Sequence, residues 1–305
     1  MAPPRIVSLL PSTTEIACAL GFRDALVGRS HECDFPPGIE ILPVCTRARF
    51  EDGTSGEIDD RVRDLVQRGL SVYHVDAERL RALAPDVILT QDQCEVCAVS
   101  VKDLEDALRQ WTGGLPRVVS LSPQTLGDVW GDIRRVGAAL GAPERAEGLV
   151  VELSNRVTEI GEQTGDTAAR PTVACIEWID PLMAAGNWVP ELVTLAGGRD
   201  PLGQPGAPSA WIEWETLRRI DPDVVLLLPC GFDLARTRAE LPTLLASPGF
   251  GDLRAVRNGR VALTDGNAYF NRPGPRLVET LEITAEILHP DRFPFGHRGR
   301  GWEPL

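Results

Sequence analysis

Short apolar runs alternate with segments of helical periodicity along the whole chain, and this alternation predicts an α/β protein. A helix starting near Ser12 follows the first run, and Glu15 completes a capping-box pattern at its start. The predicted strands of the first half are 5–10, 73–75, 87–90 and 117–121, and the predicted helices are 13–20, 58–67, 77–83 and 101–111. Such strand–helix units favour a largely parallel sheet.

The second half of the chain repeats this order. The segment 215–224 parallels 78–87, because Glu, Leu, an aliphatic residue, Pro, Asp and Val recur at one offset. Strand 172–177 corresponds to strand 5–10, and strand 260–263 corresponds to strand 117–121. The repeat therefore predicts two β/α lobes of related topology.

Between the halves the chain is almost entirely compatible with helix. Gly141 and Pro143 separate one helix from a second that runs from about Glu144 to Gln163. A helix of about 20 residues spans about 30 Å, enough to join two lobes as a rigid spine. We therefore expect an N-terminal β/α lobe (1–122), a helical connector with the long spine helix (123–165), and a C-terminal β/α lobe with its tail (166–305).

Charge and composition narrow the classes of partner. The net charge of −13 argues against nucleic acid as a partner, and no apolar run approaches the roughly 20 residues of a membrane span. The seven cysteines form no tight framework, and Met1 leads into the first strand without a signal-like segment, so a cytoplasmic protein with reduced thiols is expected. The tail with His289 and His297 is expected to face solvent.

Unusual polar and aromatic residues cluster just after the predicted strands. In open α/β sheets ligands bind at strand ends, and facing lobes would place these loops in one cleft. The candidate ligand-binding residues are His31, Glu32, Cys33, Asp34, Gln91, Asp92, Gln93, Glu177, Trp178, Asn187, Trp188, Cys230, Phe232, Asp233, Asn267, Tyr269, Phe270 and Arg272.

One of these loops contains a Cys-x-x-Cys pair, Cys94 and Cys97. The spacing fits a redox pair, half of a metal site, or thiols that line an organic-ligand pocket. Glu95 lies between the cysteines and opposes thiolate formation, which disfavours redox catalysis. With His31 and Cys33 the pair makes a Cys3His set suited to zinc or iron, and the metal site and the ligand-lining thiols both stay open.

The opening of the chain resembles a known family. The run Arg5-Ile6-Val7-Ser8-Leu9-Leu10-Pro11-Ser12-Thr13-Thr14-Glu15-Ile16 and the loop Cys33-Asp34-Phe35-Pro36-Pro37 are similar to the class III, helical-backbone substrate-binding proteins of metal-chelate ABC importers, and the cobalamin-binding members look most alike. The resemblance implies two Rossmann-like lobes, a long backbone helix and a ligand cleft between the lobes.

The resemblance also implies a partner. Surface glutamates of this family dock on arginines of the permease, and by motif position these are Glu78 and Glu215. Acidic residues in a first helical turn are also favoured by the helix dipole alone.

We therefore expect a binding protein for cobalamin or another corrinoid, used in carriage, storage or sensing. Trp178, Trp188, Tyr269 and Phe270 would stack on or flank the macrocycle, and an ABC permease or a corrinoid-using enzyme would be the partner. The alternative is a metalloenzyme in which His31 and the thiols hold the metal and Glu32, Glu177 or Asp233 transfers protons. A haem or siderophore carrier is a third possibility.

Overall fold

The computed structural model describes residues 3–68, 71–91, 104, 108, 114–165 and 170–305. The chain forms two compact units. Unit 1 comprises Met1–Gly53, Asp60–Pro123 and Gly127–Glu152, and unit 2 comprises Thr54–Asp59, Gln124–Leu126 and Leu153–Leu305. Each unit has its own sheet and core, as the internal repeat predicts, and the α/β fold class is confirmed.

Unit 1 is built on a four-stranded parallel sheet with the order β2-β1-β5-β6. Its strands are β1 (Ile6–Ser8), β2 (Leu26–Arg29), β5 (Val87–Gln91) and β6 (Arg117–Leu121). A separate antiparallel pair joins β3 (Thr46–Ala48) to β4 (Tyr73–Val75). The helical elements are α1 (Pro11–Ala19), η1 (Arg23–Ala25), η2 (Ile39–Ile41), most of α2 (Ser55–Gln67), α3 (Ala77–Leu83) and most of α5 (Leu126–Ala139).

Apolar side chains of alternate strand residues form the core of unit 1. Val7 of β1 and Ile88 of β5 pack in one cluster with Leu80 of α3 and with Val75 of β4. The periodicity of a strand sends alternate side chains to the same face, so this cluster marks the face covered by α3 and the β3-β4 pair.

Unit 2 is built on a six-stranded sheet with the order β12-β11-β10-β7-β8-β9. Strands β7 (Val173–Trp178), β10 (Val224–Leu227) and β11 (Val261–Thr264) are parallel, whereas β8 (Met183–Ala184), β9 (Ala210–Trp211) and β12 (Trp302–Pro304) pair antiparallel. The helical elements are α7 (Val189–Leu195), α8 (Trp214–Ile220), α9 (Leu234–Ala239), α10 (Leu241–Leu245), η3 (Phe250–Asp252), α11 (Arg254–Arg257), η4 (Gly266–Phe270) and α12 (Leu277–Leu288).

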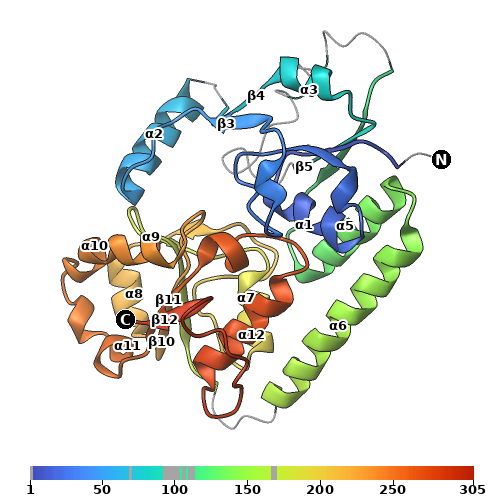
Figure 1. The fold of residues 1–305 in the computed structure, drawn as a ribbon. Coiled ribbons are helices and arrows are strands. Elements are labelled where there is room, and N and C mark those ends of the chain that lie inside the picture. The colour runs from blue at the N-terminus through green and yellow to red at the C-terminus, as the bar shows by residue number, and fades with distance from the viewer. Residues whose placement is uncertain (1–2, 69–70, 92–103, 105–107, 109–113, 166–169) are drawn as a thin grey trace. The chain divides into compact units, whose positions relative to one another are not determined.

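Helices cover both faces of this sheet. Ile176, Val225 and Leu263 are on one face and pack with Leu217 of α8 and Leu244 of α10. Figure 1 shows α7 and α12 together on the other side of the strands. A parallel core buried on both faces is the arrangement expected for βαβ connections.

The long helix expected from the sequence is present as α6 (Pro143–Gly165), drawn in green in Figure 1. Its predicted apolar face is buried, with Val150, Leu153 and Val157 all at most 8% exposed. The boundary between the units falls inside α6, between Glu152 and Leu153. The helix is thus shared by the two units, and a separate connector of residues 123–165 stays a prediction.

Two local expectations are wrong. Ser12 does not cap α1, because the helix already begins at Pro11 and Leu10 is its N-cap without a side-chain bond. The C-terminal tail is not simply solvent-facing either. Its strand β12 pairs with β11, and His297 Nε2 lies 2.9 Å from a carboxylate oxygen of Glu282.

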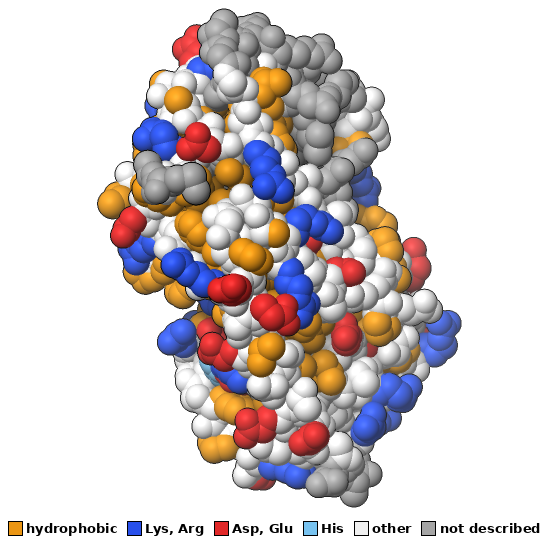
Figure 2. Space-filling model, turned by 90° about the vertical axis from the view of Figure 1, so that its right-hand side faces the viewer, with side chains coloured by type: hydrophobic (Ala, Val, Ile, Leu, Met, Phe, Trp, Pro, Cys, Tyr) orange, Lys and Arg blue, Asp and Glu red, His pale blue; other side chains and the backbone are white. Residues whose placement is uncertain are grey.

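None of the helices that the structure describes is both long and apolar enough to cross a membrane. On the face drawn in Figure 2, acidic and basic side chains are interspersed with apolar ones.

Candidate functional site

The first group of predicted ligand-binding residues lies at the ends of the strands of unit 1. Strands β2, β1 and β5 are parallel neighbours, so the chain leaves all three at the same edge of the sheet. The loop with His31, Glu32, Cys33 and Asp34 follows β2, and Gln91 ends β5. Ser12, at the start of α1, donates a hydrogen bond to Gln91 Oε1 at 3.3 Å. The structure therefore places these loops at one edge of the sheet of unit 1.

Arg29, which the sequence reasoning missed, shapes the loop after β2 from inside. The residue is 8% exposed, and its guanidinium donates to the carbonyl oxygens of Ser30 at 2.9 Å, Cys33 at 3.2 Å and Glu40 at 2.9 Å. A buried cation with several carbonyl acceptors is well compensated. Its position directly after the short apolar stretch 25–28 was the available signal.

His31 is half-buried and held by its neighbours. Its Nδ1 lies 2.8 Å from Thr46 Oγ1, and its ring lies 5.5 Å from the ring of Tyr73. The Tyr73 hydroxyl donates to Glu32 Oε1 at 2.9 Å. Burial, and then the positive charge of Arg29, lower the pKa of His31, which favours a neutral imidazole at neutral pH. A neutral imidazole is the form that ligates metals.

The predicted Cys3His metal set is only partly within the described residues. Cys33 is buried, and its Sγ lies 3.0 Å from the Thr14 hydroxyl. Cys94 and Cys97, with the candidates Asp92 and Gln93, lie outside the described residues. Within the ranges that are described, no group of three or more His, Cys, Asp and Glu side chains is arranged to hold a metal ion. The four-ligand set therefore stays a prediction.

The second group of predicted ligand-binding residues lies at the ends of the strands of unit 2. Strands β7, β10 and β11 are parallel neighbours, so Glu177 and Trp178, the Cys230 turn and the η4 segment leave the sheet at one edge. The Trp178 ring lies 5.3 Å from the Phe232 ring, and the Arg236 guanidinium lies 4.7 Å from the centroid of Phe232. Trp178 is half-buried and Phe232 is buried, so Trp178 retains partly accessible aromatic surface.

Glu177 and Asn187 are fixed by contacts within unit 2. The Ser209 hydroxyl lies 2.9 Å and 3.0 Å from the two carboxylate oxygens of Glu177. Asn187 has a left-handed backbone conformation, with φ of 53°, and its N–H donates to the carbonyl of Ala207 at 2.6 Å. Asn tolerates this conformation better than most residues. Both side chains are half-buried, Glu177 near the end of β7 and Asn187 in the loop before α7.

The turns after β10 and β11 are bonded to each other. Asp233 caps α9 by accepting from the backbone N–H of Arg236 at 2.7 Å. Asn267 N–H donates to the Phe232 carbonyl at 3.0 Å, and Arg272 Nη2 donates to Asn267 Oδ1 at 3.0 Å. Arg272 is 3% exposed, and this bond joins it to Asn267.

Asp265 is a further residue that sequence reasoning missed. It directly follows β11 and caps η4 by accepting from Ala268 N–H at 2.7 Å. Burial raises the pKa of Asp265. Its place immediately after a strand was the available signal.

Three predicted aromatic residues lie in the interior. Trp188, Tyr269 and Phe270 are 4%, 3% and 1% exposed. Trp188 Nε1 donates to the Phe270 carbonyl at 2.9 Å. We correct their expected role as flat surfaces for a macrocycle, because protein covers these rings and they belong to the core of unit 2.

The two predicted docking glutamates occupy equivalent places. Glu78 is in the first turn of α3 and Glu215 is in the first turn of α8, and both are exposed. Glu215 accepts from Arg218 Nη1 at 3.0 Å. Their docking role stays a prediction.

The strand-end edges of the two sheets carry side chains suited to binding a ligand. Each offers hydrogen-bonding groups at half-buried positions, and unit 2 adds the Trp178 ring. Such loops at strand ends suit a small-molecule ligand with polar edges. The predicted ligand cleft between the lobes stays a prediction.

Comparisons with known proteins agree with this fold. Residues 6–268 match the model of a family described as periplasmic binding protein. An uncharacterized ABC transporter substrate-binding lipoprotein of Bacillus subtilis (strain 168), YvrC, is 23% identical over 95% of this chain and 82% of its own length. The vitamin B12-binding protein of Photorhabdus laumondii is 22% identical over 94% of this chain and 89% of its own length.

Solved structures give the same result for the fold. A periplasmic heme-binding protein from Pseudomonas aeruginosa has a TM-score of 0.72 and 22% identity, and the match covers 100% of this chain and 95% of that chain. This likeness confirms the two-lobe α/β architecture implied by the resemblance of the opening segment. Because the family model matches most of the sequence, this chain belongs to the periplasmic binding protein family.

Proposed function

We propose that the protein binds a corrinoid, or a related metal chelate, and presents it to an ABC permease. The observation that carries the proposal is the pair of strand-end edges, one in each unit, with half-buried polar groups that include His31, Glu177 and Asn187. Relatives named for binding vitamin B12 match nearly the whole chain, which supports a ligand of this class.

The half-buried groups at these edges suggest how such a ligand is held. A corrinoid has a largely apolar face and a rim of amides, so an aromatic ring and hydrogen-bonding side chains are the complementary partners. Trp178 supplies the ring, and Glu177 and Asn267 supply acceptors and donors at the same edge of unit 2. In unit 1, His31 supplies a neutral imidazole that can approach the metal of the chelate.

Visible spectroscopy distinguishes the possible ligands. We expect cyanocobalamin to give a saturable change of the corrin bands and heme to give a weaker one. Trp178→Ala is expected to weaken binding about tenfold or more, because central aromatic contacts dominate binding free energy. Trp211→Ala is the matched control, since Trp211 is 54% exposed on the edge strand β9. Equal loss in both variants, or saturable binding of heme alone, argues against the proposed ligand.

The place of the protein in the cell decides how the ligand is used. The alternative to presentation to a permease is a cytoplasmic use, which we propose from the thiol-rich composition; the described residues Cys18, Cys33, Cys45, Cys175 and Cys230 are free thiols. Carriage to an importer needs the protein where the ligand arrives, whereas storage, sensing or delivery to a corrinoid-using enzyme needs it inside. Cell fractionation followed by immunodetection separates these uses, and protein found only in the periplasmic or membrane fraction contradicts the cytoplasmic proposal.

A further inference from the structure

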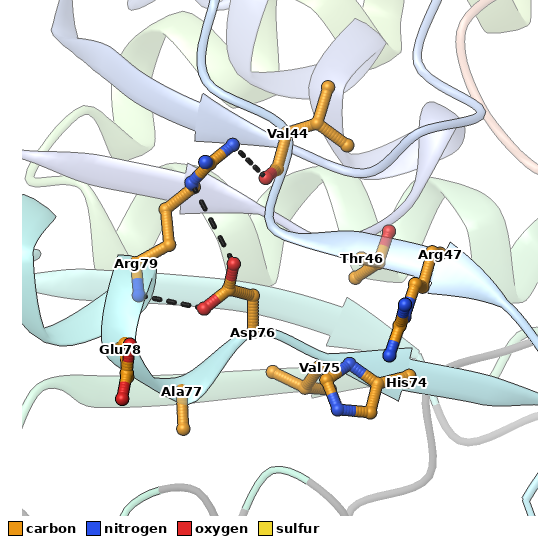
Figure 3. Close-up of a pocket in the computed structure, with 9 residues that line it drawn as sticks. All are labelled: Val44, Thr46, Arg47, His74, Val75, Asp76, Ala77, Glu78 and Arg79. Atoms are coloured by element: carbon orange, nitrogen blue, oxygen red, sulfur yellow. Dashed lines mark hydrogen bonds and ion pairs between the residues drawn. The ribbon is translucent and has the colours of Figure 1, made fainter.

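A surface hollow in unit 1 lies between the β3-β4 pair and the start of α3 (Figure 3). It has a volume of about 600 Å³. We call it the hairpin hollow, and its lining residues are Val44, Thr46, Arg47, His74, Val75, Asp76, Ala77, Glu78 and Arg79. The hollow is formed by α3 and the β3-β4 pair, and it borders the loop after β2, because Thr46 lines the hollow and its hydroxyl lies 2.8 Å from His31 Nδ1.

Two basic side chains share one face of this hollow. Arg47 and His74 are directly opposite each other in the antiparallel register of β3 and β4. Their strand neighbours Thr46 and Val75 are buried, so the alternation of a strand sends Arg47 and His74 outward. Directly opposite side chains have Cβ atoms about 5 Å apart, so the pair can contact one group together. Figure 3 shows both side chains at the same end of the hollow.

Arg79 and Asp76 hold the wall of the hollow in place through hydrogen bonds and an ion pair. Arg79 Nη1 donates to the Val44 carbonyl at 3.1 Å, and its Nε lies 3.8 Å from Asp76 Oδ2. Asp76 Oδ1 accepts from the Arg79 backbone N–H at 2.9 Å. These contacts neutralise Asp76 and Arg79 and tie α3 to the segment before β3.

The remaining charged groups have no such partners. Within the described residues, no hydrogen bond or ion pair involves the side chains of Arg47, His74 or Glu78. Glu78 lies at the opposite end of the hollow from Arg47 and His74 in Figure 3. The hairpin hollow therefore offers a basic end and an acidic end, both unpaired. A lone anion would satisfy only one of the two ends, whereas a protein surface with both signs would satisfy both.

We propose that the hairpin hollow is a docking site in which Arg47 and His74 bind an acidic side chain of the ABC permease while Glu78 meets a basic one. This inference rests on the proposed function and adds two residues that determine the choice of partner. Complementary charges of this kind set specificity and association rate. Charge reversal at Arg47 puts a negative group at the end of the hollow where the acidic side chain binds, and so repels it.

Photo-crosslinking in cells tests the proposal. The photoreactive residue p-benzoyl-phenylalanine is placed at Ala82, which is exposed on α3 one turn beyond Glu78 and leaves all three charged groups in place. We expect ultraviolet light to capture a protein that mass spectrometry identifies as an ABC permease subunit. Adding Arg47→Glu is expected to lower the yield about fivefold, and Arg47→Gln is expected to lower it less.

Arg68→Glu is the matched control, because Arg68 is exposed beyond the end of α2 and does not line the hollow. Capture of no permease subunit, or equal yields with Arg47→Glu and Arg68→Glu, overturns the docking site. Titration of the same purified proteins with cyanocobalamin reports ligand binding separately. Failure of docking with intact cobalamin binding therefore rejects this inference alone.

Discussion

The indole Nε1 of Trp188 donates a 2.9 Å hydrogen bond to the carbonyl oxygen of Phe270. This bond joins the start of α7 to η4, two segments far apart in the sequence of unit 2. Both residues are at most 4% exposed, so the acceptor has no access to bulk water. An unsatisfied buried carbonyl is costly, and the bond therefore stabilises the loop that carries Asn267.

Trp188→Phe is expected to lower the free energy of unfolding by roughly 1–3 kcal/mol, because it leaves the Phe270 carbonyl without its donor. Urea unfolding followed by circular dichroism measures the change. Trp211→Phe, at an exposed position, is expected to change stability by less than about 0.5 kcal/mol. If Trp188→Phe were as stable as the wild type, the structural role of this ring would be refuted.

Because Asp132 of α5 is buried, we expect the protein to lose stability as the pH rises. It is 3% exposed, and burial raises its pKa to about 6 despite Arg135 Nη1 at 2.9 Å. A carboxyl whose pKa is raised in the folded state binds more protons there than in the unfolded state. Its contribution to stability therefore falls as pH rises from about 4 to 6 and stays low above that.

Asp132→Asn removes this titration, so the variant is expected to gain about 1–3 kcal/mol relative to wild type between pH 4.5 and pH 8. Urea midpoints at the two pH values measure the gain. A stability difference between variant and wild type that does not change with pH would show that Asp132 titrates normally.

Ala84 is held in a backbone conformation that favours glycine. It ends α3 with φ of 41°, and Asp221 ends α8 with φ of 45°. A left-handed conformation costs an alanine roughly 1–2 kcal/mol, part of which glycine recovers. We expect Ala84→Gly to raise stability by about 0.5 kcal/mol. Thermal unfolding measures it against Ala82→Gly, inside α3, which is expected to lower stability by about 1 kcal/mol; the reverse order would contradict the argument.

The Cys-x-x-Cys pair makes a separate prediction about metal. If Cys94 and Cys97 ligate zinc or iron with His31 and Cys33, the double variant Cys94→Ser, Cys97→Ser loses stoichiometric metal while its circular dichroism spectrum is unchanged. Elemental analysis under reducing conditions measures the metal. Cys18→Ser is the control, since Cys18 is on α1 outside the predicted set. Full metal occupancy in the double variant would exclude these thiols as ligands.

The internal repeat is the part of the fold that the sequence predicts best. Asp86 Oδ2 accepts from the backbone N–H of Arg5 at 2.8 Å, and Asp223 Oδ2 accepts from that of Thr172 at 2.9 Å. Each aspartate thus fixes the start of the first strand in its own unit. The repeated Pro-Asp-Val therefore has a physical basis, which is why the two units could be predicted from pattern alone.

The roles of individual site residues were harder to predict. Glu177 lies near the end of one strand and Phe270 lies in a segment that follows another, but only the fold shows that Glu177 is half-buried and Phe270 fully covered. Ser12 fits a capping box locally, yet Pro11 starts the helix and the Ser12 hydroxyl bonds Gln91 instead. Burial and long-range hydrogen bonds are tertiary properties, and a periodic pattern does not contain them.

Calorimetric titration of the purified protein with cyanocobalamin tests the central claim most directly. The proposed function predicts a saturable heat with one ligand per chain, and a weaker affinity in Trp178→Ala than in Trp211→Ala. No heat with cyanocobalamin, together with no change in the corrin bands at millimolar ligand, would contradict it.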